Sequence, residues 1–151
     1  MKTARHTTRR IRYHADPMAA LKLINRLEPF TPDELIELEL PIRLAFDSIK
    51  NGRGTLQDIS DIGAAINTTM VRAESISPTC VQAAITARDA LLRTLTRYHS
   101  TGRVGFDGPA IADVAVGIDL HEQMLRLSSP AQMADALREV MRRVAEQQII
   151  Q

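Results

Sequence analysis

The chain has 151 residues, 44% of them hydrophobic and 25% charged, with a formal net charge of +1. This length suits one domain with a core of its own, and the apolar runs are too short to span a bilayer, so we expect no membrane partner. The single cysteine, Cys80, excludes an internal disulfide framework and is typical of a reducing cytoplasm, where we expect the protein to reside.

The N-terminal segment, residues 1–15, is basic. It contains no acidic residue and five basic ones: Lys2, Arg5, Arg9, Arg10 and Arg12. The rest of the chain holds more acidic than basic side chains. We interpret residues 1–15 as a flexible arm that neutralises nucleic-acid phosphates, contacts an acidic protein surface or only aids solubility.

A capping residue followed by proline marks most of the predicted helix starts. The capping oxygen accepts a free backbone N–H of the first turn, and proline fits there because it lacks that N–H. Such pairs occur at Asp16-Pro17, Thr31-Pro32, Ser77-Pro78 and Ser129-Pro130, with further starts at Thr55 and Gly108-Pro109. With the helical spacing of apolar residues, they predict six helices, at about 17–27, 32–50, 55–75, 78–99, 109–127 and 130–147. No stretch alternates as a strand would. We therefore predict one all-α domain, a helical bundle over residues 16–151.

Proline occurs once inside a predicted helix. Pro41 removes a backbone hydrogen bond from the second helix, so we expect this helix to bend there. Pro41 lies away from the apolar stripe that contains Ile42 and Phe46. The predicted kink should therefore face solvent.

Residues 55–73 resemble a helix-turn-helix motif of the lac-repressor type in their opening and closing residues. However, Gly63 lies one position too early for the turn of that motif. An apolar stripe from Ile59 to Ala73 also continues without interruption. We favour one long helix and keep the DNA-binding motif as the alternative.

Arg88, in the fourth predicted helix, is surrounded by apolar positions. A buried guanidinium has to be paired, because an unpaired charge in a core costs several kcal/mol. We expect either an ion pair with an acid such as Asp113 or an anchor at a subunit or partner interface, where arginine is enriched.

The fifth predicted helix carries Asp119, His121 and Glu122 close together, as in many metal or acid–base sites. A zinc-binding helix would need a second histidine four positions after His121, where the sequence has Leu125. We therefore interpret His121 as a packed residue beside a solvated charged strip, and we expect no metal, cofactor or catalytic residue. If the protein were an enzyme, the surface near His121 or His99 would be the place to look.

The same helix is apolar on two nearly opposite faces. One face contains Val114 and Ile118, and the other contains Leu120 and Met124. A helix of this kind is either central in its bundle or shared with a second copy of the chain. A homodimer is therefore one form that an interaction could take.

Several segments from Ala15 to Val144 resemble an uncharacterised family of small helical proteins found on prophages and plasmids of beta-proteobacteria. They are FTPDEL, PIRLAF, INTTMVRAESI, GRVGFDGPAI, IDLHEQMLRLSSPAQM and ALREVMRRV. The resemblance implies a bacterial cytoplasm and an accessory gene of a mobile element. It brings no established activity and no functional residue.

The sequence thus predicts a non-catalytic protein that binds another, unidentified protein. On a mobile element, such a protein could inhibit a host complex or adapt a nucleic-acid-processing complex. The alternative is a nucleic-acid-binding regulator that uses the basic arm, with or without residues 55–73. Steep salt dependence of binding would distinguish the second function from the first.

Overall fold

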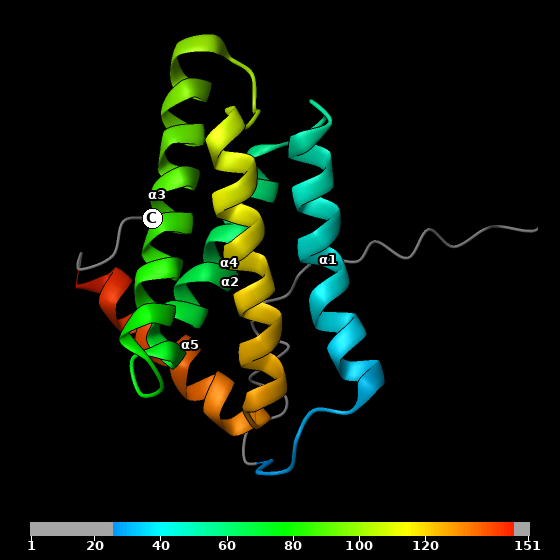
Figure 1. Ribbon diagram of the computed structural model, residues 1–151, viewed down its shortest axis with the longest axis vertical. Helices are drawn as coiled ribbons and strands as arrows, with labels where there is room; N and C mark the ends of the chain where they lie inside the picture. Colours follow the sequence, from blue (N-terminus) through cyan, green and yellow to red (C-terminus); the bar gives the residue numbers. More distant parts are fainter. Residues whose placement is uncertain (1–25, 147–151) are drawn as a thin grey trace, which may run out of the picture.

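The described part of the chain is entirely helical. The computed structural model describes residues 26–146, which form five helices and no strand (Figure 1). They are α1 (Pro32–Lys50), α2 (Leu56–Ala73), α3 (Pro78–Thr101), α4 (Gly108–Leu127) and α5 (Pro130–Ala145). The all-α prediction is confirmed for this range.

The basic arm lies outside the described residues, as does the predicted helix at 17–27 except for its last two residues. Those two, Arg26 and Leu27, belong to the irregular segment that precedes α1. The first of the six predicted helices, at 17–27, is therefore not confirmed, and the arm stays a prediction.

Side-chain caps explain where the helices begin. Thr31, Thr55 and Ser129 each accept a hydrogen bond from the third residue of the following helix, whose side chain bonds back to the cap. At α4 the cap is Asp107, one residue before the predicted start, because its carboxylate accepts the Ala110 N–H at 2.7 Å. These local contacts fix the helix starts close to the positions predicted from sequence.

Two predictions about the helix interiors have different outcomes. α2 runs from Leu56 to Ala73 without a break, so the helix-turn-helix alternative for residues 55–73 is wrong: no turn divides the stretch into two helices. α1 continues as a helix through Pro41, and the bend predicted there is not confirmed.

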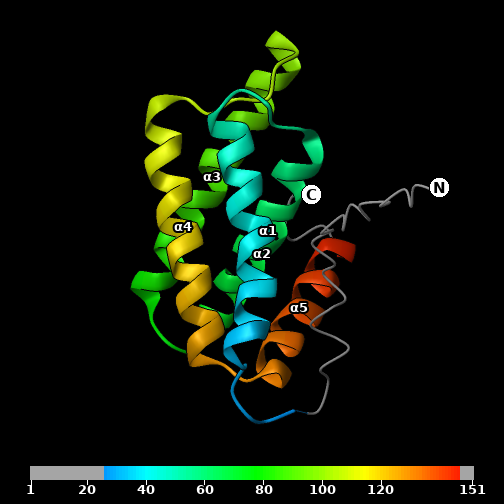
Figure 2. The same cartoon turned by 90° about the vertical axis from the view of Figure 1, so that its right-hand side faces the viewer.

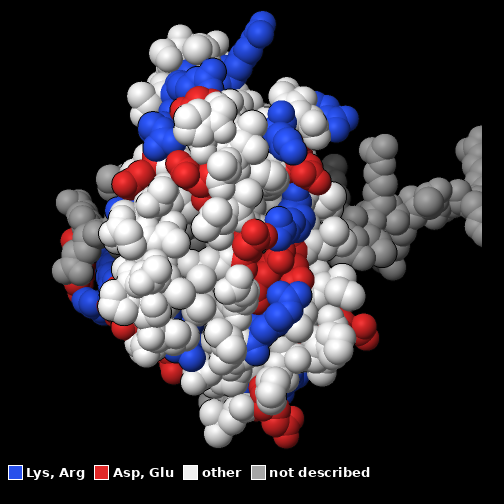
Figure 3. Space-filling model, in the orientation of Figure 1, with Lys and Arg blue, Asp and Glu red and all other residues white. Residues whose placement is uncertain are grey.

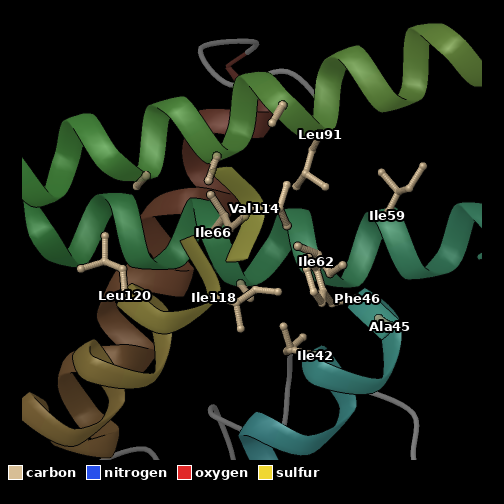
Figure 4. Close-up of a cluster of buried hydrophobic side chains, with 14 of the residues drawn as sticks. Ile42, Ala45, Phe46, Ile59, Ile62, Ile66, Leu91, Val114, Ile118 and Leu120 are labelled. Atoms are coloured by element: carbon tan, nitrogen blue, oxygen red, sulfur yellow. The ribbon is translucent and has the colours of Figure 1, made fainter. Parts of the chain in front are cut away.

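α2 is the central helix of the bundle, since it contacts each of the other four (Figures 1 and 2). α5 crosses the lower end of the molecule as drawn. The main core lies between α1, α2, α3 and α4 and includes Ile62, Ile66, Val114 and Ile118 (Figure 4). A smaller cluster of Phe30, Leu125 and Met133, with Leu35 and Leu38 packed against it, closes the end near α5.

Central packing accounts for the two apolar faces of α4. This helix contacts α1, α2 and α3, and Val114, Ile118, Leu120 and Met124 are all buried. The face with Val114 and Ile118 and the middle of the face with Leu120 and Met124 are therefore covered inside one copy of the chain, whereas Val116 and Leu127 stay exposed. The pattern in α4 does not require a second copy.

Candidate interaction surface

The acidic side chains of Asp119 and Glu122 hold α4 against α1. Arg43 of α1 donates from Nε to Glu122 at 2.6 Å and from Nη2 to Asp119, also at 2.6 Å. The hydrogen bond with Glu122, supported by Asp119, raises the pKa of the Arg43 guanidinium. The charged residues form a continuous strip between the two helices in Figure 3. We call this strip the α1–α4 seam.

The seam continues one turn further along α4. Arg126 forms an ion pair with Glu39 of α1 at 2.7 Å and donates to the backbone carbonyl of Glu122 at 3.1 Å. Side chains that are engaged across an interface in this way have a structural role in the described body.

His121 points to the opposite side of α4, into the core. Its Nδ1 forms a hydrogen bond of 2.9 Å with the hydroxyl of Thr69 on α2, and both side chains are buried. Burial lowers the pKa of His121 to about 4, because the core disfavours the charged imidazolium. The imidazole is therefore neutral near neutral pH and does not converge with Asp119 and Glu122 on a common site.

Within residues 26–146, no group of three or more His, Cys, Asp or Glu side chains could hold a metal ion. In the same range, no helix is both long and apolar enough to cross a membrane.

Arg88 and Asp113 are not brought together. Arg88 forms a 3.5 Å ion pair with its neighbour Asp89, whereas Asp113 pairs with Arg93, also at 3.5 Å. α4 starts beside the C-terminal end of α3, so its second turn is level with Arg93 and not with Arg88. The expected Arg88–Asp113 pair is therefore not formed. Arg88 remains partly buried, and its Nε donates no hydrogen bond within the described residues.

The outer face of α1 carries an apolar surface of its own. Ile36, Leu40 and Leu44 follow one another at four-residue spacing and are 58%, 40% and 51% exposed. This spacing places them on one side of the helix, away from the buried Ile42 and Phe46. We call the three residues the α1 outer stripe. The four-residue spacing of these apolar residues is visible in the sequence. The sequence alone does not single out this face, because the buried face of α1 carries a longer apolar stripe.

Acidic side chains surround the α1 outer stripe. Asp33 lies one turn before it, Glu37 beside it and Asp47 one turn after it, and all three are exposed. Within the described residues, none of the three carboxylates forms an ion pair. Three large apolar side chains framed by free negative charge define the candidate interaction surface.

Other exposed large apolar side chains are more scattered. Val116 and Leu127 of α4 are 53% and 65% exposed but lie three turns apart, with Asp119 and Gln123 exposed between them. Isolated exposed apolar residues of this kind are normal on a protein surface. They provide matched controls for the α1 outer stripe.

Comparison of the chain with protein families, curated proteins and solved structures finds no match.

Breaking the α1–α4 seam should destabilise the fold moderately. We expect Arg43→Gln to lower the free energy of unfolding by about 1 kcal/mol, because the half-buried Glu122 loses its cation while part of the site stays open to water. Arg138→Gln, which removes an exposed pair with Asp135 on α5, should change it by less than about 0.5 kcal/mol. Urea unfolding measures both values, and equal effects would contradict a structural role for the seam.

Proposed function

We propose that the protein is a non-catalytic interaction protein that binds a partner protein through the α1 outer stripe. The observation that supports this is the exposure of Ile36, Leu40 and Leu44 on one face of α1. Apolar side chains at this spacing are the pattern with which one helix docks into a groove or along another helix. Because each is only about half exposed, covering it would contribute roughly 1 kcal/mol to binding.

The charges around the stripe favour a basic partner. Asp33, Glu37 and Asp47 would face lysine or arginine side chains that flank an apolar stripe on the other protein. A second copy of the chain fits less well: in an antiparallel pair centred on Leu40, each Asp33 would lie opposite the Asp47 of the other copy. The proposed partner therefore presents a basic amphipathic helix.

The resemblance to prophage and plasmid proteins suggests where this partner belongs. We infer a bacterial host complex, or a nucleic-acid-processing complex of the mobile element, that is inhibited or adapted when the protein binds. This assignment rests on the resemblance alone, whereas the docking face rests on the exposure of α1.

The proposal is tested by affinity capture from a bacterial host lysate with matched variants. Ile36→Ser/Leu44→Ser should reduce recovery of a captured protein by at least about tenfold, because two apolar contacts at the centre of the interface are lost. The control, Val116→Ser/Leu127→Ser, removes two apolar side chains of at least similar exposure from α4 and should leave recovery unchanged.

Charge reversal tests the nature of the partner. Asp33→Lys/Asp47→Lys should weaken capture of the same protein and make the remaining binding less sensitive to salt. Equal losses for the α1 and α4 serine variants, or tighter capture after charge reversal, would contradict the proposed docking face or the proposed basic partner, respectively.

A further inference from the structure

An open cavity lies at the end of the bundle where two connections meet. The α1–α2 connection and the start of α2 form one wall, and the C-terminal end of α3 with the following connection forms the other. The cavity has a volume of about 1260 Å³. Four glycines occur in its lining, Gly52, Gly54, Gly102 and Gly105, so much of the wall is bare backbone. A bulky ligand can therefore approach the chain closely.

Basic side chains without a carboxylate partner gather around this cavity. Arg97 and Arg103 line it, Arg53 lies between two lining glycines, and Lys50 ends α1 beside them. All four are exposed, and none forms an ion pair within residues 26–146. Lys and Arg side chains gather at this upper end in Figure 3. We call these four residues the basic rim.

The basic rim differs from the rest of the described surface. Every other arginine in this range bonds to a side chain of the body: Arg72 to two serine hydroxyls, and the remainder to carboxylates. Within the described residues, Arg72 is thus the one cation outside the basic rim whose side-chain partners are neutral, and all the others are paired with carboxylates. Uncompensated cations that gather at one end of a bundle attract an anion from solution.

We propose that the basic rim binds nucleic acid through its phosphate backbone. The four cations are spread over the ends of α1 and α3 and the connections that follow them, which suits a polymer with repeated negative charges better than one small anion. Apart from Leu56 and Val104, the lining is mostly glycine, threonine and arginine, and so offers few of the apolar anchors that protein interfaces use. Tyr98 is also part of the lining, and an aromatic residue can stack with a base.

This site is separate from the α1 outer stripe. The rim lies at the end of the bundle, whereas the stripe runs along the side of α1. The bonds to nucleic acid would be to phosphate oxygens, so binding should depend steeply on salt and little on base sequence.

The test uses the full-length chain and a fluorescein-labelled DNA duplex, with the matching single strand as a second probe. Fluorescence anisotropy is measured between about 50 and 200 mM salt. We expect Arg97→Ala/Arg103→Ala to weaken binding about tenfold or more and to lower the slope of log affinity against log salt by about 2. The control, Arg138→Ala/Arg142→Ala, removes two positive charges from α5 and should bind like the wild type.

A second variant separates charge from folding. Arg97→Lys/Arg103→Lys keeps both charges and should retain most of the affinity, since phosphate contacts require a cation more than a guanidinium. Three results would overturn the proposal: a wild-type chain that binds neither DNA probe, equal affinity of the two alanine variants, or tighter binding of poly-glutamate than of DNA. If binding were lost only when residues 1–15 are removed, the DNA contact would belong to the arm, and this result would also overturn the proposal.

Discussion

Acidification should destabilise the protein through His121 before the surface carboxylates contribute. The pKa of this imidazole is lowered to about 4 by burial, whereas in the unfolded chain it is near the ordinary value of 6.5. Below the unfolded pKa, the unfolded chain takes up a proton that the folded chain does not. Stability is therefore complete above about pH 6.5 and is lost as the pH falls toward 4, by on the order of 3 kcal/mol.

Urea unfolding at several pH values checks this prediction. His121→Gln should be less stable than wild type at neutral pH, because the packed ring is lost, but its stability should change much less between about pH 6.5 and 4.5. His99→Gln is the matched control, since His99 is exposed at the end of α3 and its replacement should leave the wild-type slope unchanged. A wild-type slope that persists in His121→Gln would show that the buried imidazole is not its source.

The carboxylates affect stability in a lower pH range than His121 does. Arg26 lowers the pKa of Glu34 to about 2, and Arg142, with Arg143, lowers that of Glu139 to about 2. The stabilisation from these acids is present above their ordinary pKa of 4.5 and is lost as the pH falls from there toward 2. Measurements above about pH 4.5 therefore report mainly on His121.

Two chemically identical substitutions should have opposite effects on stability. A Cβ atom added at Gly117 would lie 2.4 Å from the Cβ of Ala87, where α4 packs directly on α3. Neither side chain can move aside, so Gly117→Ala must push the helices apart. We expect it to lower the free energy of unfolding by roughly 1–3 kcal/mol, in spite of the gain in helix propensity.

Gly63 of α2 is the matched control. An added Cβ atom there meets no other atom within 4 Å. Gly63→Ala should therefore raise the free energy of unfolding by about 0.5–1 kcal/mol, since alanine favours a helix interior over glycine. Thermal or urea unfolding of both variants checks the pair. Stabilisation by both substitutions would contradict the close packing of α3 on α4.

Local features of the described fold were predictable from the sequence because they depend on neighbouring residues. Thr31, Thr55 and Ser129 cap helices where expected, and the stripe from Ile59 to Ala73 is buried on α2 as one continuous helix. The buried position of His121 also follows from its place at the border of an apolar face. These predictions needed only helix periodicity and capping chemistry.

Features that depend on helix register could not be predicted in this way. The close contact between Gly117 and Ala87 fixes the position of α4 along α3. At this position Asp113 forms an ion pair with Arg93 and not with Arg88. The sequence indicates a solvated charged strip at Asp119 and Glu122, whereas the packing of α1 brings Arg43 into contact with both carboxylates. The basic rim also depends on tertiary structure, because it forms where the α1–α2 and α3–α4 connections, which are far apart in the sequence, lie side by side.

Site-specific photo-cross-linking tests the proposed docking face most directly. A photoreactive phenylalanine analogue is placed at position 40 in the α1 outer stripe or, as the control, at position 116 of α4, and each protein is irradiated in host lysate. We expect a discrete cross-linked product with another protein from position 40 and none from position 116. Cross-links from position 116 alone, from neither position, or from position 40 only to a second copy of the chain would contradict a docking face for a basic partner on α1.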